Sequence, residues 1–187
     1  IACDIRLNDA LEHNLVVPFH YFGITDIQSL DYENVDLSKI DELAKLLNVN
    51  KRVDFIIEQM NFYSFNGNKR KVIGFCVSKE HCSFMSKSFN DKGINASYLT
   101  SDDSVLKRVE NIKKLEDEND SLEVIFTVDI FNEGIDIPSI NTVLFLRPTN
   151  SPIVFIQQLG RGLRKHKNKE FLTVLDFIGN HKKAYLI

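Results

Sequence analysis

The feature that most constrains the fold of this 187-residue chain is an alternation of short apolar runs with amphipathic segments. It begins near Lys71 and continues almost to the end of the chain. The short runs are apolar throughout, whereas apolar residues in the longer segments recur at helical spacing. This alternation is typical of βαβ units, in which helices cover both faces of a parallel sheet. We therefore predict an α/β fold.

The predicted strands lie at 71–77, 95–99, 122–128, 141–146 and 171–178. Helices are expected at 79–93, at 101–119 and from Pro152 onward. Gly93 is a typical helix stop, and Ser151-Pro152 is a typical helix start. Because ligands of parallel sheets bind at the carboxyl ends of the strands, the loops that follow the strands are the first candidates for function.

The first third of the chain is less regular. We expect a short helix around 8–15 and then an extended or strand-like piece at 16–27. A helix that begins at Lys39 has Ser38 as its candidate cap, with Asp41 and Glu42 in its favourable first turn. A second helix, at 51–63, carries one apolar stripe, which consists of Val53, Ile56, Ile57 and Met60.

Composition excludes several classes of protein. Hydrophobic residues make up 43% of the chain, and no apolar run approaches about 18 residues, so we expect no membrane span. The chain starts at Ile1 with charges among its first apolar residues, which is unlike a signal peptide and suggests part of a longer protein. Its three cysteines form no C-x-x-C pair. This favours a reducing compartment, core cysteines and no metal site.

Charge is unevenly distributed along the chain. The whole sequence has 23 Lys and Arg against 26 Asp and Glu, a net charge of −3. Residues 147–187 contain eight Lys and Arg against two Asp and Glu, a balance of +6, which leaves −9 for residues 1–146. A basic end on an acidic chain indicates an anionic ligand, and a solvated basic surface is the alternative.

One candidate site follows the strand that ends near Thr127, in the sequence D-I-F-N-E-G-I-D-I-P. Gly134 lets the backbone turn there. Asp136 is placed to accept hydrogen bonds from sugar hydroxyls or from an arginine. The alternative is that Asp136, which precedes Ile137-Pro138, only caps a turn.

A second candidate site is the sequence Q-Q-L-G-R-G-L-R. On a helix Gln157, Arg161 and Arg164 lie within roughly 60° of one another. These groups suit a polyphosphate, because each arginine offers a planar fork of donors. Gly160 and Gly162 each cost about 1 kcal/mol relative to Ala in a helix interior, so either the helix ends there or a large group comes close. The alternative is a surface helix with a glycine stop and a basic last turn.

Three segments in this order resemble a known family: G-F-C-V-S-K-E-H-C, F-T-V-D-I-F-N-E-G-I-D-I-P and Q-Q-L-G-R-G-L-R. They are similar to motifs IV, V and VI of the second RecA-like lobe of superfamily 2 helicases and translocases. The resemblance covers about residues 70–180 and is greatest to the DNA-directed branch of DEAD/DEAH-type proteins, which includes the motor subunits of type I and type III restriction enzymes. It implies a RecA-like parallel sheet of the P-loop NTPase type for 70–187, and an interlobe connection with accessory helices for 1–69.

The resemblance also implies a nucleotide site shared between two lobes. Arg161 and Arg164 match the arginine fingers that reach the γ-phosphate of ATP, and Gln157 would contact the same phosphate or its attacking water. Three further residues would border the nucleotide, namely Gly134, Asp136 and Gly160.

Five residues match positions that hold the phosphate backbone of the tracked strand, namely Ser78, Thr100, Ser101, Arg108 and Thr127. Such contacts make binding salt-sensitive and largely independent of sequence. For Ser78 and Thr127 the alternative is an ordinary hydroxyl at a strand end. DNA is favoured over RNA, because DEAD-box RNA helicases usually carry His where Gln157 stands and Arg-Gly where this chain has Glu133-Gly134.

The sequence contains neither a phosphate loop of the form G-x-x-x-x-G-K-[ST] nor a D-E-x-[HD] metal tetrad. ATP and Mg²⁺ would therefore be held by an N-terminal RecA-like lobe of the same protein, and we do not expect this fragment alone to hydrolyse ATP. The sequence thus predicts the C-terminal motor lobe of a cytoplasmic, ATP-dependent DNA helicase or translocase. One alternative is a non-catalytic RecA-like module that binds nucleic acid or docks a partner. Another is an unrelated doubly wound nucleotide-binding domain.

Overall fold

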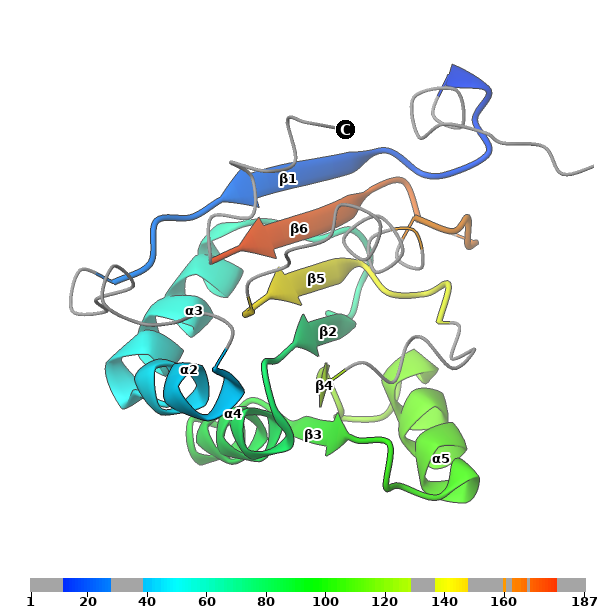
Figure 1. Ribbon diagram of the computed structural model, residues 1–187. Helices are drawn as coiled ribbons and strands as arrows, with labels where there is room; N and C mark the ends of the chain where they lie inside the picture. Colours follow the sequence, from blue (N-terminus) through cyan, green and yellow to red (C-terminus); the bar gives the residue numbers. More distant parts are fainter. Residues whose placement is uncertain are drawn as a thin grey trace, which may run out of the picture.

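A six-stranded parallel sheet forms the centre of the computed structural model, which describes residues 12–27, 39–128, 137–147, 160, 163–167 and 169–177 (Figure 1). The strands are β1 (Phe19–Gly23), β2 (Val72–Phe75), β3 (Ala96–Leu99), β4 (Val124–Thr127), β5 (Thr142–Phe145) and β6 (Leu172–Asp176). The helices are α2 (Ile40–Leu47), α3 (Asn50–Phe62), α4 (Lys79–Asp91) and α5 (Val105–Glu116). Within these described residues no helix is long and apolar enough to cross a membrane.

The strand order across the sheet is β1-β6-β5-β2-β4-β3, and each neighbouring pair is parallel. All carboxyl ends therefore lie at one edge of the sheet. The ends of β2, β4 and β3 come together there, since Thr127 on β4 is in register with Phe75 on β2 and Leu99 on β3. The predicted parallel α/β fold is confirmed.

β1 lies within the extended piece that was expected at 16–27. It pairs with β6 from Phe19↔Leu172 to Gly23↔Asp176, so the first strand of the chain lies beside the last. The hydroxyl of Tyr21 also donates to the carboxylate of Asp176. Residues from the first third of the chain are thus part of the same sheet as residues from 70–187.

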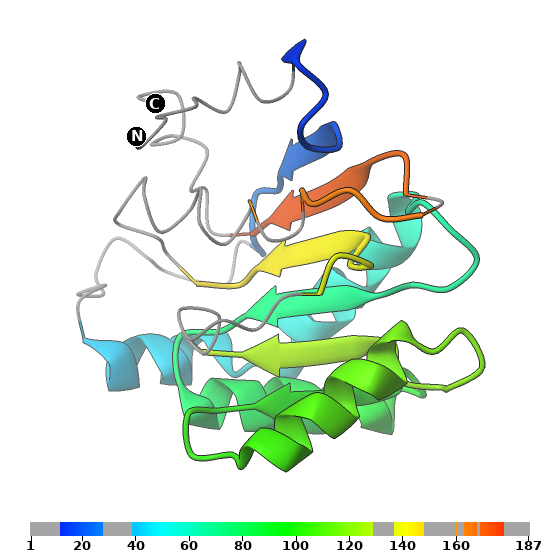
Figure 2. The ribbon, with the colours of Figure 1, turned by 90° about the vertical axis from the view of Figure 1, so that its right-hand side faces the viewer.

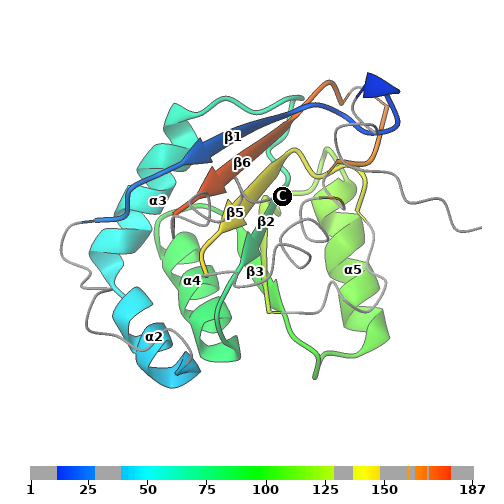
Figure 3. The same cartoon turned by 45° about the horizontal axis from the view of Figure 1, so that its top comes forward.

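The two faces of the sheet are covered by different helices. On one face the strands contact α5 in a buried cluster that includes Ile73, Ile125 and Leu115. On the other face they contact α3 and α4 in a second cluster, which includes Val124 and Met85. Figures 2 and 3 show α5 on one side of the sheet, with α3 and α4 on the opposite side. The apolar runs therefore serve as strands that are buried on both faces, as the sequence pattern predicts.

Local signals explain where α4 and α5 begin and end. Gly93 follows α4 with a φ of +80°, a left-handed conformation that favours glycine after a helix. α5 begins at Val105, later than the predicted start at 101, because Ser104 is its cap. The hydroxyl of Ser104 accepts from the amide of Lys107 at 3.3 Å.

The start of α2 differs slightly from the prediction. The helix begins at Ile40, with Lys39 in the cap position and no side-chain capping bond. Ser38, the predicted cap, lies outside the described residues. Asp41 and Glu42 lie in the first turn as expected, where negative charge is favourable.

Cys76 and Cys82 are buried and free, as the core interpretation of the cysteines predicts. Burial, together with the neighbouring Cys82, raises the pKa of the Cys76 thiol well above its ordinary value, so this thiol stays protonated. Several predicted features lie outside the described residues: Cys3, most of the helix around 8–15, Gly134, Asp136, Gln157, Arg161 and most of the helix from Pro152.

Candidate nucleic-acid and nucleotide site

Three neighbouring strands carry predicted backbone-binding residues at their carboxyl ends. Ser78 follows β2, Thr127 ends β4 and Thr100 follows β3. Because β4 lies between β2 and β3, Thr127 lies between the loops that carry the other two residues. The fold thus brings three hydroxyl residues that are distant in sequence to one edge of the sheet.

Ser78 is the cap of α4. Its hydroxyl oxygen accepts from the amide of His81 at 3.1 Å, and the residue is buried. This bond satisfies one of the amides that have no partner within the first turn of a helix. A serine hydroxyl that accepts through its oxygen still has its own hydrogen to donate. The backbone amide of Glu80 and the hydroxyl of Ser78 lower the pKa of the exposed Glu80 carboxylate. Ser78 therefore caps α4, and an anion would have to compete with Glu80 for its hydroxyl hydrogen.

The loop after β3 is a tight turn around Asp103. The carboxylate of Asp103 accepts from the amide of Thr100 at 2.7 Å and from its hydroxyl at 3.3 Å. Lys107 pairs with the same carboxylate at 2.5 Å. Burial opposes the ionisation of Asp103, but Lys107 and the Thr100 amide outweigh burial and lower its pKa. The Thr100 hydroxyl therefore supports this turn.

Other cations at this edge also have partners within the chain. Lys79 of α4 pairs with Asp102, and this pair joins the amino end of α4 to the loop after β3. Arg108 of α5 donates to the carbonyl of Ser101 at 2.8 Å. Exposed ion pairs contribute only about 0–1 kcal/mol, so a phosphate can compete with Asp102 for Lys79. The carboxyl edge therefore carries at least one cation, Lys79, whose exposed partner a phosphate can replace.

Thr127 differs from the other two hydroxyl residues. Its side chain is fully buried, and its Oγ1 has no hydrogen-bond partner within the described part of the chain. Its backbone carbonyl accepts from the amide of Cys76 at 2.9 Å, which ties the end of β4 to the loop after β2. Most buried hydroxyls in proteins are hydrogen-bonded, and one left without a partner costs about 1–3 kcal/mol. Thr127 is thus an exception that requires a reason.

Arg164 lies away from these residues, because its segment precedes β6 and is on the amino side of the sheet. Leu163 beside it is buried in the cluster on the α5 face. The carbonyl of Leu163 accepts from the amide of Val17, just before β1, at 2.8 Å. Arg164 itself is exposed. The chain therefore anchors the backbone at Leu163 and leaves the next residue accessible.

The described residues give no packing reason for glycine at position 160. Its conformation is helical, and a Cβ added to it would meet nothing within 4 Å. Any close approach at this position would have to come from outside the described part of the chain.

Residues 39–166 match the family model of the helicase conserved C-terminal domain. The chain belongs to this family. The matched span includes the candidate residues from Ser78 to Arg164, at both edges of the sheet. The parallel sheet with its covering helices is the RecA-like fold of helicase C-terminal domains.

Known proteins support this assignment. The putative ATP-dependent helicase IRC3 of Saccharomyces cerevisiae is 33% identical over 156 residues, which cover 83% of this chain and 22% of that protein. A fragment of a putative HsdR subunit of a type I restriction enzyme from Vibrio vulnificus has a TM-score of 0.74 at 18% identity, over 96% of this chain and 35% of that one. The C-terminal domain of the DEAD-box protein Dbp5 has a TM-score of 0.57 at 14% identity, over 90% and 82%. The helicase C-terminal domain described here spans 22% to 36% of the length of three curated relatives.

The carboxyl edge of this helicase C-terminal domain also contains a buried charge that sequence analysis missed. Arg52 of α3 is fully buried, and its Nε donates to the carboxylate of Asp26, after β1, at 2.7 Å. Its Nη1 and Nη2 have no hydrogen-bond partner in the described residues. The apolar stripe of α3 was predicted, but Arg52 has no local signal of burial, because its partner comes from another element.

His81 is buried close to this charge. Burial, with the nearby Arg52, lowers the pKa of His81 to about 3. The neutral ring accepts from the amide of Val77 through Nδ1 at 3.3 Å, which helps to shape the loop between β2 and α4. His81 thus has a structural role in positioning Ser78.

Proposed function

We propose that this chain is the C-terminal motor lobe of an ATP-dependent DNA helicase or translocase. The observation that carries the proposal is the gathering of Ser78, Thr127 and Thr100 at the ends of three adjacent strands, in a chain that matches the helicase C-terminal family. The relative named as a putative ATP-dependent helicase supports the dependence on ATP.

In this proposal the phosphates of a DNA strand lie along the carboxyl edge of the sheet. The Ser78 hydroxyl exchanges the carboxylate of Glu80 for one phosphate, beside the positive amino end of α4. The buried Thr127 hydroxyl gains the partner that it lacks in the described chain. Lys79 and Arg108 exchange their present partners for phosphate oxygens, and Thr100 and Ser101 shape the loop between them. Contacts of this kind position a strand without reading its bases.

DNA rather than RNA is the proposed substrate. The support comes from Gln157 and from Glu133-Gly134, which differ from the residues usual in DEAD-box RNA helicases. We also propose a reducing, cytoplasmic location, which the buried free thiols of Cys76 and Cys82 support.

Arg164, with Arg161 and Gln157, would complete a nucleotide site whose other half belongs to an N-terminal RecA-like lobe of the same protein. Arg164 fits this role because it is exposed beside the anchored Leu163, and a guanidinium suits the oxygens of a γ-phosphate. The described residues contain no group of three or more His, Cys, Asp or Glu that could hold a metal ion. The proposal therefore assigns the ligands of Mg²⁺ to the first lobe.

The two sets of residues would act together in a cycle of lobe closure. Bound ATP supplies the phosphoryl group whose transfer to water drives the cycle. Closure brings Arg161 and Arg164 to its γ-phosphate, with Gly134, Asp136 and Gly160 at the border of the nucleotide. After hydrolysis these arginines lose their contact with the γ-phosphate, and the lobes separate. The residues at the carboxyl edge then bind phosphates further along the strand.

The test is the DNA-stimulated ATPase of the full-length protein with Arg164→Ala. We expect turnover to fall by on the order of 10³-fold, because arginine fingers contribute this much where they have been measured. Lys165→Ala is the matched control, since Lys165 is the neighbouring exposed cation and has no assigned contact with the nucleotide.

Wild-type turnover in Arg164→Ala would exclude the finger assignment. If the wild-type full-length protein binds DNA but shows no stimulated ATPase, the chain is instead a non-catalytic module that binds nucleic acid or docks a partner.

A further inference from the structure

The segment that carries Arg164 is held at both of its ends. At the first end Leu163 is buried, and its carbonyl accepts from the amide of Val17 at 2.8 Å. At the second end the amide of Glu170 donates to the side-chain oxygen of Asn66 at 2.9 Å. Arg164 therefore lies on a short piece of chain that is attached to the domain on each side of it.

Lys169 adds a second attachment at the far end. Its Nζ donates to the carbonyl of Pro138 at 3.0 Å. Pro138 ends the sequence G-I-D-I-P, two residues after Asp136. Burial lowers the pKa of Lys169 to about 7, and both the ammonium and the neutral amine can donate this bond. Lys169 thus links the two segments that contain the proposed nucleotide residues.

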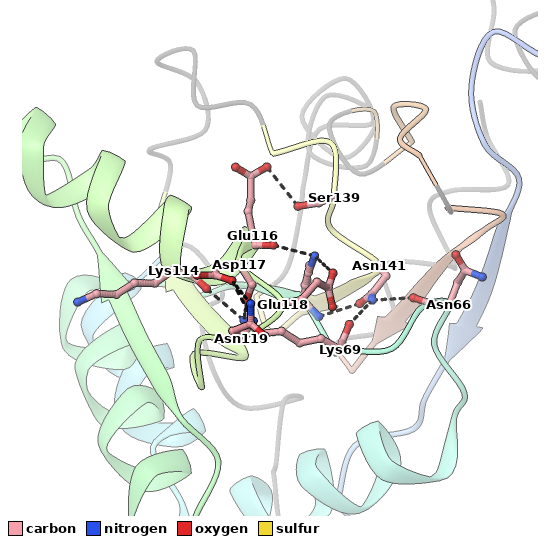
Figure 4. A network of polar contacts seen from close by, with 10 residues as sticks. Asn66, Lys69, Lys114, Glu116, Asp117, Glu118, Asn119, Ser139 and Asn141 are labelled. Carbon is pink, nitrogen blue, oxygen red and sulfur yellow. Dashed lines mark hydrogen bonds and ion pairs between the residues drawn. The ribbon is translucent and has the colours of Figure 1, made fainter.

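The two partners at the far end lie in or beside a polar network on the amino side of the sheet: Asn66 is a member of it, and Pro138 precedes its member Ser139 (Figure 4). Asn141 is its centre: its Oδ1 accepts from the amide of Lys71 at 2.9 Å, and its Nδ2 donates to the carbonyls of Asn66 and Lys69 at 2.7 and 2.8 Å. The hydroxyl of Thr142 also donates to its Oδ1 at 3.4 Å, so both donors and both acceptor positions of this buried amide are in use.

The same network extends to the last residue of α5, Glu116. The Nζ of Lys71 donates to the carbonyl of Glu116 at 3.0 Å, and the hydroxyl of Ser139 donates to the carboxylate of Glu116 at 3.2 Å. Figure 4 shows these contacts converging from several loops at the amino side of the sheet. A satisfied polar network of this kind holds its parts in one arrangement.

We propose that Lys169 and Asn66 are positioning residues that hold the Arg164 segment in a fixed place on this network. The inference rests on the proposed function of Arg164 as an arginine finger. It matters that the backbone is already fixed before the nucleotide binds, because displacing a catalytic group by about 1 Å can lower the rate on the order of 10²-fold. Neither residue contacts the nucleotide. Each acts only by holding the segment that carries Arg164.

The experiment is a double-mutant cycle on the DNA-stimulated ATPase of the full-length protein. Lys169→Met removes the bond to Pro138 and keeps an unbranched side chain. We expect kcat to fall by about ten- to a hundredfold, with a much smaller change in KM for ATP, because the finger acts in the transition state. In the Arg164→Ala background the same change should have no further effect. Lys167→Met is the control, since Lys167 is exposed on the same segment.

Each outcome decides a different point. If Arg164→Ala lowers turnover but Lys169→Met behaves as wild type, the positioning role is wrong and the finger remains. If the two losses multiply, Lys169 does not act through Arg164, and the inference is also wrong. If Arg164→Ala itself keeps wild-type turnover, the proposed finger role of Arg164 is wrong, and the inference that rests on it is wrong as well.

A second pair of variants covers the case in which Lys169→Met does not fold. Asn66→Ala removes the acceptor for the Glu170 amide, whereas Asn66→Asp keeps an oxygen at the same place. Asn66→Ala should lower kcat and Asn66→Asp should restore it. Equal rates in the two variants would overturn the inference.

Discussion

Gly74 is a residue at which the backbone of one strand must approach a ring on the next. It is paired with Phe126 in the β2–β4 register. A Cβ at Gly74 would lie 2.5 Å from Cδ1 and 2.7 Å from Cε1 of Phe126. The ring is confined, because it also packs edge-on against Phe89 of α4 with centroids 4.9 Å apart. Glycine at this position therefore makes room for the ring.

Gly74→Ala should destabilise the domain by about 1–3 kcal/mol, the usual cost of overpacking a core. The free energy of unfolding of the 187-residue chain, measured with urea, checks this prediction. Gly160→Ala is the matched control, because the added Cβ meets no neighbour within 4 Å in the described part of the chain. Alanine is more stable than glycine in a helix by up to about 1 kcal/mol, so the free energy of unfolding should stay the same or rise. Equal losses in the two variants would contradict the packing argument.

At the scale of elements, the junction between β2 and α4 depends on one neutral imidazole. His81 lies in the first turn of α4, where its backbone amide donates to Ser78 and its Nδ1 accepts from Val77. The ring is buried beside a permanent positive charge, Arg52, which disfavours its protonation. Protonation would remove the acceptor for Val77, so the shape of this loop requires the neutral ring.

This junction predicts a loss of stability in acid. The pKa of His81 is about 3 in the folded domain against an ordinary value of 6.5, so between these values only the unfolded chain takes up the proton. Stability should therefore fall as the pH drops below 6.5, by up to about 1.4 kcal/mol per pH unit from this residue. His81→Asn keeps an acceptor near the position of Nδ1 and does not titrate. The free energy of unfolding, measured with urea at several pH values, should depend less on pH in the variant than in the wild type. An unchanged pH dependence would refute the assignment of this effect to His81.

At the scale of the whole molecule, the domain has candidate functional residues at two opposite edges of one sheet. The hydroxyl residues lie at the carboxyl edge, and the Arg164 segment is attached on the amino side. The strands between them are buried on both faces and connect the edges rigidly. In the proposed motor this arrangement would let one domain contact DNA and a nucleotide at separate places.

The carboxyl edge predicts salt-dependent, sequence-independent binding of single-stranded DNA. Arg108→Ala in the full-length protein should weaken binding equally for unrelated sequences. It should also reduce the slope of log affinity against log salt by about 0.7, the value for one phosphate contact on a single strand. Fluorescence anisotropy over a series of salt concentrations measures both effects.

The control for this prediction is Lys114→Ala. Lys114 is an exposed cation further along α5, where it pairs with Glu110 at 2.7 Å, and it is not part of the candidate site. Its loss should leave the salt slope unchanged. A loss of affinity in Arg108→Ala that depends on the base sequence would argue against a backbone contact.

Much of the fold could be predicted because its signals are local. The apolar runs identify β2 to β6, and Gly93 and the charges of Asp41 and Glu42 mark helix ends correctly. The resemblance to the helicase motifs also identified Ser78 and Thr127 as a pair worth testing. What residue types could not show is how each hydroxyl is bonded: Ser78 caps a helix, whereas Thr127 is buried without a partner in the described chain.

The sequence by itself determined the class of the fold, the order of the helicase segments and the chemistry available at each edge. These properties depend on neighbouring residues and on the spacing of apolar side chains. Only the tertiary structure decided that β1 lies beside β6, that Arg52 is buried on Asp26, and that Asn66 and Lys169 hold the Arg164 segment. Each of these contacts joins residues that are far apart in the chain. Their partners are set by strand order and burial, which no local pattern encodes.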